Sequence, residues 1–415
     1  MIFGSIAAGK IKVKNFLFAR DTLATVDCFR KLGVQIKTNR KKKTVEISGR
    51  GKEALRPPET VLDVGNSGTT IRILTGLLAG LPFKSRIKGD ASIARRPMGR
   101  LVRPLRLMGA RIFGREKKGE IYPPLEIAGQ PLRGITYELP LSSAQVKSAL
   151  LLAGLSARGV TEIREPVPSR DHTERMFEYF GCRMKKKNGF LKVEPSFQLK
   201  GKNLEIPGDF SSAAFFMVAA LILPGSKIIL KNVGINPGRV GLLEVLEKMG
   251  ARIKIKKIRY FGREPLADIE VRYSKLWAVE IEGSLIPRII DEIPILTVAA
   301  IFASGRTVIK NAAELRVKES DRVKSIAVEF RKMGARIQER PDGLIIEGTG
   351  KLKSASVKSH GDHRIAMALV VAGLRTPAGL VIEDTDCIAT SFPEFPQLLK
   401  KVVGRPKFFK RKETR

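Results

Sequence analysis

The chain has 415 residues, of which 43% are hydrophobic and 28% are charged, and its formal net charge is +35. This composition excludes a long disordered chain, and the length exceeds that of one ordinary core, so we expect two folded domains of roughly 200 residues each. The charge predicts that the surface attracts anionic molecules, without indicating which anion.

Six segments share one pattern, in which a helix of small residues is followed by a glycine and then by a strand-like run of Ile and Val. In chain order they are residues 2–13, 71–87, 146–163, 211–229, 295–309 and 365–382. Six repeats divide naturally into two domains of three. We place the boundary at Pro207, which gives domains of residues 1–207 and 208–415, the second ending in a basic tail.

A second series of helices alternates with the first. These segments are amphipathic, and each is followed by a glycine and then by a strand, as expected for a glycine C-cap. The capping glycines are Gly33, Gly109, Gly181, Gly250 and Gly334, and residues 395–403 resemble a sixth copy. Each repeat is therefore expected to hold two helices and about four short strands, with the amphipathic helix covering a sheet.

The residues that precede the small-residue helices are rich in glycine, hydroxyl groups and single cations. A helix start presents unpaired N–H groups and a positive dipole end, and anions bind there. One such start is ordinary N-capping, but five on a repeated frame predict a pocket for a small polyanion. The five begin at Gly65, Ser142, Gly208, Asp291 and Gly361. No such residues precede the first helix, so we expect its ligand-binding segment to be missing.

Cys28, Cys182 and Cys387 are isolated and lack CxxC or metal-ligand spacing. This indicates a reducing compartment and no structural zinc. The N-terminal residues do not form a secretory signal, and the longest apolar run, residues 213–224, is shorter than the roughly 18 residues that span a bilayer. We expect a cytoplasmic, soluble protein.

Six ordered segments resemble the signatures of the 5-enolpyruvylshikimate-3-phosphate synthase family, one branch of the enolpyruvyl transferases. The similarity runs from Met1 to Leu399. The segments are residues 62–72 (LDVGNSGTTIR), 89–98 (GDASIARRPM), 142–151 (SSAQVKSALL), 168–174 (PSRDHTE), 315–322 (LRVKESDR) and 361–367 (GDHRIAM).

The resemblance implies an α/β (α+β) fold of two domains, each of three βαββαβ repeats, that close on the substrates. It implies transfer of the enolpyruvyl group of phosphoenolpyruvate to the 5-hydroxyl of shikimate 3-phosphate, with release of phosphate. The partners would be these two small anions, with no membrane and no specific nucleic acid. No metal or organic cofactor is implied, and we expect a monomer.

By the same matching, each implied role falls on particular residues. Arginine suits phosphate and carboxylate because its planar fork binds oxyanions with two hydrogen bonds. Phosphoenolpyruvate would contact Gly68, Arg96, Gln145, Arg322 and Arg364. Shikimate 3-phosphate would contact Ser143, Ala144, Gln145, Ser169, Arg170, Asp291 and Lys318. Asp291 would lie near the attacking hydroxyl, and Lys318 and Glu319 would handle protons. As alternatives, Arg322 is an ordinary ion-pair partner on a helix surface, and His363 is structural.

The chain departs from the family pattern in two places. Thr390 stands where many members carry a Lys, so affinity for phosphoenolpyruvate and its analogues is expected to differ. The family also has a Gly-Asp-Lys-Ser-x-Ser-x-Arg segment just before the residues equivalent to 2–5. Losing its cations from an anion site would cost several kcal/mol. We expect the chain as written to be inactive or severely impaired, and a form extended upstream to be active.

Two other functions compete with this prediction. The transferase that adds enolpyruvyl to UDP-N-acetylglucosamine shares the repeat architecture, but its catalytic loop usually carries a Cys, and residues 89–100 contain none. The net charge and the basic residues 405–412 favour a nucleic-acid-binding protein. Against this, aromatic residues make up only 6% of the chain, and no base-stacking motif is present.

Overall fold

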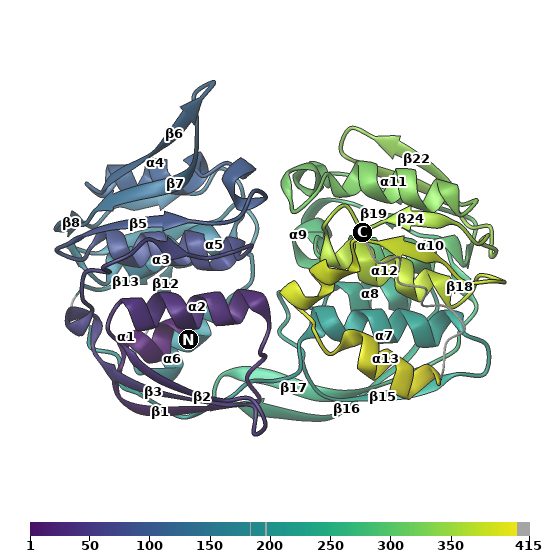
Figure 1. Ribbon diagram of the computed structural model, residues 1–415, viewed down its shortest axis with the longest axis horizontal. Helices are drawn as coiled ribbons and strands as arrows, with labels where there is room; N and C mark the ends of the chain where they lie inside the picture. The colour runs from purple at the N-terminus through teal and green to yellow at the C-terminus, as the bar shows by residue number, and fades with distance from the viewer. Residues whose placement is uncertain (183, 196, 405–415) are drawn as a thin grey trace. The chain divides into compact units, whose positions relative to one another are not determined.

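The computed structural model describes residues 1–182, 184–195 and 197–404 (Figure 1). The basic tail at 405–412 lies outside this range. The described residues form two compact units, the first of Met1–Ile206 with Phe261–Glu264, the second of Pro207–Tyr260 with the described residues that follow Glu264. The sequence predicted a division between residues 207 and 208, but it did not predict that Phe261–Glu264 belongs to the first unit.

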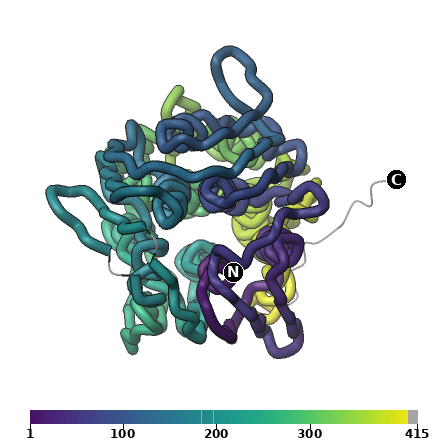
Figure 2. The backbone as a smooth tube through the Cα atoms, turned by 90° about the vertical axis from the view of Figure 1, so that its left-hand side faces the viewer, coloured from purple at the N-terminus to yellow at the C-terminus, as the bar shows by residue number. Residues whose placement is uncertain are grey.

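The first unit is built on three four-stranded sheets, in which a short strand lies parallel to its neighbour and a hairpin lies antiparallel. The sheet orders are β14-β1-β3-β2, β4-β5-β7-β6 and β12-β13-β11-β9, with β10-β8 as a separate pair. The strands are β1 (Ala8–Lys14), β2 (Gln35–Asn39), β3 (Thr44–Arg50), β4 (Leu62–Asp63), β5 (Lys84–Lys88), β6 (Arg111–Lys117), β7 (Glu120–Ala128), β8 (Leu132–Arg133), β9 (Thr136–Glu138), β10 (Ala157–Arg158), β11 (Thr161–Arg164), β12 (Lys185–Lys187), β13 (Phe190–Val193) and β14 (Leu204–Glu205). The turn between β6 and β7 projects from the unit (Figure 2).

Inner and outer helices alternate along the first unit. The inner helices are α1 (Ile2–Ile6), α3 (Gly68–Ala79) and α5 (Ala144–Gly154), and the outer ones are α2 (Arg20–Lys31), α4 (Gly99–Leu107) and α6 (His172–Tyr179). Small residues let α3 and α5 pack closely, since a Cβ on Gly76 would lie 2.2 Å from the carbonyl oxygen of Ala149. Gly33, which follows α2, has a φ of 86°, the left-handed conformation expected of a helix-ending glycine.

The segment Phe261–Glu264 connects two strands of the second unit but packs on α6 of the first. His172 Nδ1 lies 2.7 Å from Glu264 Oε1, and Arg175 Nη1 donates a 2.6 Å hydrogen bond to the carbonyl oxygen of Arg263. The ring centroids of Tyr179 and Phe261 are 6.4 Å apart. These contacts cover the outer side of α6.

The second unit repeats this plan with one three-stranded sheet, β15-β17-β16, one four-stranded sheet, β19-β21-β23-β22, and the pairs β18-β20 and β24-β25. The strands are β15 (Lys227–Gly234), β16 (Arg252–Phe261), β17 (Glu264–Arg272), β18 (Leu276–Trp277), β19 (Glu280–Ile281), β20 (Ala303–Ser304), β21 (Arg306–Ile309), β22 (Arg336–Arg340), β23 (Gly343–Glu347), β24 (Ser356–Lys358) and β25 (Val381–Glu383).

The inner helices of the second unit, α7 (Phe210–Ile222), α10 (Ile293–Ile301) and α12 (His363–Gly373), pack against one another and are almost fully buried. The remaining helices are α8 (Gly241–Lys248), α9 (Ile286–Ile289), α11 (Arg322–Lys332) and α13 (Phe395–Val403). Short 3-10 turns occur at Lys52–Ala54, Ile93–Arg95, Gly283–Leu285, Ala313–Val317 and Thr385–Thr390. Two units of mixed sheets with inner and outer helices confirm the predicted α/β class. No helix in the described residues is both long and apolar enough to cross a bilayer.

Candidate active site

The N-terminus of α3 carries two guanidinium groups in the first unit. Ser67 caps the helix, because its Oγ accepts a 3.3 Å hydrogen bond from the Thr70 amide. A Cβ on Gly68 would lie 2.8 Å from Arg96 Nη1 and 2.9 Å from Arg72 Nη1, so a side chain here would displace the ends of both arginines. Two cations beside a helix start form an anion-binding arrangement.

Polar neighbours hold both guanidinium groups in place. Arg96 is 7% exposed, and its Nη2 donates to Asn66 Oδ1 at 3.3 Å and to Ser92 Oγ at 3.2 Å. Arg72 Nη1 donates to Gln145 Oε1 at 3.0 Å. The structure therefore brings the predicted residues Gly68, Arg96 and Gln145 together. Arg72 ends the recognised segment 62–72 but was assigned no substrate contact, although its position one helical turn after Gly68 was a usable signal.

Five of the seven residues expected to contact shikimate 3-phosphate lie in two segments of the first unit. Ser143 caps α5, with its Oγ accepting a 3.4 Å hydrogen bond from the Val146 amide, and Ala144 begins that helix. Ser169 and Arg170 lie in the loop between β11 and α6. Ser142 ties the two segments, because its Oγ donates to the carbonyl oxygen of Val167 at 2.5 Å.

Arg322 is the centre of a buried charge cluster in the second unit. It is 1% exposed, and its Nε donates to Asp362 Oδ2 at 2.7 Å while its Nη2 donates to Glu319 Oε2 at 2.6 Å. Its Nη1 lies 3.6 Å from Asp291 Oδ1. Burial alone would lower the pKa of Arg322, but the charges of Asp362, Glu319 and Asp291 outweigh it and the pKa is raised. Arg322 is therefore an ion-pair partner, as the alternative has it, but it is buried and does not lie on the helix surface.

Asp362 joins Arg322 to Arg364 at the start of α12. It is fully buried, and its Oδ1 accepts a 2.9 Å hydrogen bond from the Arg364 amide as the N-cap. The Arg364 side chain turns to Asp291, donating from Nη1 to its carbonyl oxygen at 3.0 Å. The structure thus groups four of the predicted site residues, namely Asp291, Glu319, Arg322 and Arg364. It adds Asp362, which lay in a recognised segment but was not singled out.

Lys318 and His363 complete the predicted set in the second unit. Lys318 Nζ donates to Glu314 Oε1 at 2.9 Å, one helical turn back along the chain. His363 is 6% exposed, and burial lowers its pKa to about 4. A neutral imidazole adds no positive charge to the cluster, in keeping with the structural alternative for His363.

A further polar group lies at the start of α7, one of the five predicted helix starts, but its partners Arg239 and Glu292 were not predicted. Arg239 Nη2 donates to Asp209 Oδ1 at 3.0 Å and to Ser211 Oγ at 2.6 Å, and Ser211 Oγ donates to Glu292 Oε1. Glu292 Oε1 in turn lies 3.7 Å from Arg364 Nη1. The starts of α7, α10 and α12 are therefore linked by side-chain contacts within this unit.

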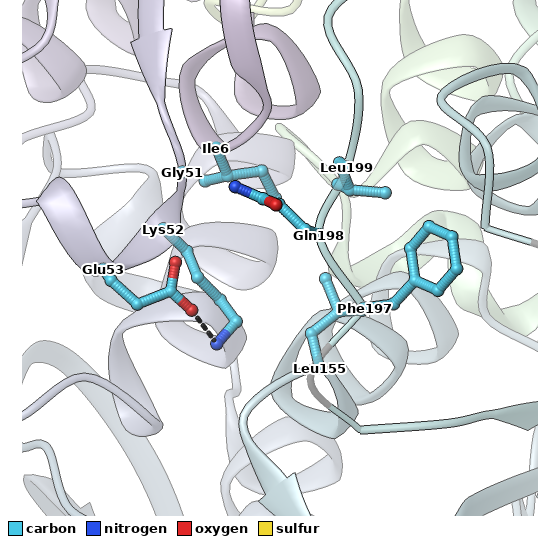
Figure 3. A pocket seen from close by; sticks show the side chains of 8 residues that line it. All are labelled: Ile6, Gly51, Lys52, Glu53, Leu155, Phe197, Gln198 and Leu199. Carbon is cyan, nitrogen blue, oxygen red and sulfur yellow. Dashed lines mark hydrogen bonds and ion pairs between the residues drawn. The ribbon is translucent and has the colours of Figure 1, made fainter.

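Other features of the described residues lie apart from these clusters. A hollow of about 190 Å³ in the first unit is lined by residues that include Ile6, Leu155 and the ion pair of Lys52 and Glu53 (Figure 3). Ile6 and Leu155 lie at the C-terminal ends of α1 and α5, away from the helix starts that carry the site residues. Across the described part of the chain, no His, Cys, Asp and Glu side chains are grouped to hold a metal ion.

Comparisons with known proteins match almost the whole chain. Residues 1–399 match the model of the family described as EPSP synthase (3-phosphoshikimate 1-carboxyvinyltransferase). The 3-phosphoshikimate 1-carboxyvinyltransferase of Desulforudis audaxviator is 53% identical over 402 residues, 97% of this chain and 93% of the relative. That of Geobacter sulfurreducens is 50% identical over 98% of this chain and 94% of the relative. A solved EPSP synthase from Acinetobacter baumannii superposes with a TM-score of 0.84 at 45% identity, covering 97% of this chain and 92% of that one. The chain therefore belongs to the EPSP synthase (3-phosphoshikimate 1-carboxyvinyltransferase) family.

Proposed function

We propose that this chain transfers the enolpyruvyl group of phosphoenolpyruvate to the 5-hydroxyl of shikimate 3-phosphate and releases phosphate. The observation that carries the proposal is the buried cluster of Arg322 and Arg364 around Asp291, in a chain 53% and 50% identical to relatives named for this activity. Two guanidinium groups beside a carboxylate suit a reaction in which an anion and a reacting hydroxyl lie side by side.

Each substrate is assigned to groups that match its charge. Phosphoenolpyruvate carries a phosphate and a carboxylate, and we assign it Arg96, Arg322 and Arg364, with Gly68 and Gln145. Arginine binds both kinds of oxyanion with paired hydrogen bonds. Shikimate 3-phosphate is assigned the first turn of α5 with Ser143, Ala144 and Gln145, the loop residues Ser169 and Arg170, and Asp291 with Lys318.

The proposed chemistry is addition followed by elimination. The 5-hydroxyl oxygen bonds to C2 of phosphoenolpyruvate and gives up its proton to Asp291, while C3 gains a proton. The intermediate then loses a proton from C3 and expels phosphate from C2, which restores the double bond. We assign the proton transfers at C3 to Lys318 and Glu319, with Arg322 close enough to hold Glu319 in position at 2.6 Å.

A phosphate-release assay on the purified full-length protein tests the proposal. Any release of phosphate, even at the low rate expected for the chain as written, should require both substrates, and Asp291→Asn should lower kcat further while the variant stays folded. UDP-N-acetylglucosamine should not replace shikimate 3-phosphate. Release with the UDP-sugar, or binding of neither anion in calorimetry, would overturn the assignment. A monomer acting in the cytoplasm is part of the proposal, and light scattering should give a mass near 45.8 kDa.

A further inference from the structure

Lys147 is among the most deeply buried side chains of the first unit, with 1% exposed. It lies on α5, one helical turn after Ser143, and the later part of that helix is apolar. A buried ammonium group needs charged partners, because desolvation otherwise disfavours it. Lys147 Nζ donates to Glu165 Oε2 at 2.8 Å and lies 2.7 Å from Glu174 Oε1.

Glu165 also binds Ser169, in the loop between β11 and α6. Its Oε2 also accepts a 3.1 Å hydrogen bond from the Ser169 amide, and its Oε1 accepts a 2.5 Å hydrogen bond from the Ser169 hydroxyl. One carboxylate therefore fixes both the backbone and the side chain of Ser169. Its buried charge is balanced by Lys147, so the position of Ser169 depends on the ammonium group.

Further contacts, made by Ser142 and Ser148, join α5 and the residues just before it to the same region. Ser142 Oγ bonds the backbone of Val167 at 2.5 and 3.1 Å, and Ser148 Oγ lies 2.5 Å from Thr173 Oγ1 on α6. Lys147 thus makes the charged contact among those that join α5 to the loop between β11 and α6. Burial alone would lower its pKa, but Glu174 and Glu165 outweigh it and raise the pKa, so the link stays charged at neutral pH.

We propose that Lys147 is a positioning residue that acts through Glu165 to hold Ser169 and Arg170 against the first turn of α5. This inference rests on the proposed function, since both segments are assigned to shikimate 3-phosphate. A charged link between them fixes the spacing of donors around one substrate. Its loss should therefore weaken binding of shikimate 3-phosphate far more than binding of phosphoenolpyruvate, because misplaced donors lose their hydrogen bonds.

Lys147→Met tests the inference, because Met keeps most of the side-chain length and removes the charge. The KM for shikimate 3-phosphate should rise about 10-fold or more, while the KM for phosphoenolpyruvate changes by less than about 3-fold. Lys147→Arg should restore most of the loss. Lys192→Met is the matched control, because Lys192 pairs with Glu162 in the same unit without reaching the loop.

A double-mutant comparison separates positioning from mere stabilisation. In a Ser169→Ala background, Lys147→Met should raise the KM for shikimate 3-phosphate little further, since both changes break one connection. Glu165→Gln keeps one acceptor for Ser169 and should show a smaller rise in KM. It also serves as the test if Lys147→Met does not fold.

The possible outcomes decide between the two proposals. A lower kcat with both KM values unchanged would mean that Lys147 only stabilises the fold, and the inference would fail. Unchanged kinetics, or fully additive effects with Ser169→Ala, would also overturn it. Calorimetric titration with shikimate 3-phosphate alone provides a readout independent of turnover. If the wild type binds neither anion and releases no phosphate, the proposed function itself is wrong.

Discussion

Asp362 offers the most direct test of the charge cluster in the second unit. Its carboxylate accepts four hydrogen bonds: at Oδ2 from Arg322 Nε (2.7 Å) and Ser320 Oγ (3.2 Å), and at Oδ1 from the Arg364 amide (2.9 Å) and Arg322 Nη2 (3.3 Å). Asp362→Asn keeps the volume and removes the charge. Asn is as good an N-cap as Asp, so its oxygen should take the place of Oδ1 and its amide nitrogen that of Oδ2.

The cost of this change follows from the bonds that are lost. The new amide N–H points at Arg322 Nε, which is also a donor, while the Ser320 hydroxyl can rotate to accept. One charge-assisted bond is therefore lost and a buried guanidinium loses part of its compensation, which together cost about 3 kcal/mol. If Arg322 loses its orientation in the reaction as well, 3 kcal/mol corresponds to a roughly 100-fold drop in kcat/KM.

The single tryptophan makes the stability measurement specific to this unit. Trp277 lies on β18 of the second unit, so its fluorescence during urea unfolding reports on that unit. Asp321→Asn is the control, because Asp321 also caps a helix but is 34% exposed in its pair with Arg316. The control should change stability by less than about 1 kcal/mol. If Asp362→Asn unfolds at the wild-type midpoint with kcat/KM within about 3-fold, the assigned role of Asp362 is refuted.

Three further predictions concern single residues. Burial lowers the pKa of His363 from 6.5 to about 4, so the folded chain binds fewer protons than the unfolded chain in this window. The stability that comes from keeping His363 neutral is fully present above pH 6.5, and roughly 3 kcal/mol of the free energy of unfolding should be lost as the pH falls towards 4. His363→Gln should not show this loss. Equal slopes of unfolding free energy against pH in the two proteins would disprove the prediction. Gly76→Ala should lower the thermal midpoint, at a cost of about 1–3 kcal/mol, because its Cβ would meet the Ala149 carbonyl oxygen at 2.2 Å; a midpoint at or above wild type would refute it. Gly68→Ala should displace Arg96 Nη1, which would lie 2.8 Å from the new Cβ, and raise the KM for phosphoenolpyruvate without unfolding the chain; an unchanged KM would show that the guanidinium moves freely.

The helices could be predicted because their signals are local. A glycine after an amphipathic run ends a helix within a few residues, as Gly33 and Gly334 do with φ of 86° and 84°. The repeat also predicted which helices are buried, because small residues recur along the inner ones. What the sequence did not predict is that Phe261–Glu264 returns to the first unit, since no local pattern marks a contact with residues about 90 positions earlier.

In the candidate site too, contacts between residues close in sequence could be predicted, whereas contacts between different elements could not. Glu319 lies only three residues before Arg322, at the entry to α11, so their pairing is a local contact. The contacts of Arg322 with Asp362 and Asp291 depend on how α10, α11 and α12 pack, which sequence spacing does not determine. Lys147 was visible as the only cation of α5, but its partner Glu165 lies outside that helix.

The return of Phe261–Glu264 also bears on how the chain is made. A ribosome that has released only residues 1–206 has not yet supplied the segment that covers α6 through Arg175 and Tyr179. The first half therefore completes its surface only after a hairpin of the second half has been synthesised. Exchanging the first unit between relatives would therefore mean carrying this four-residue segment along with it.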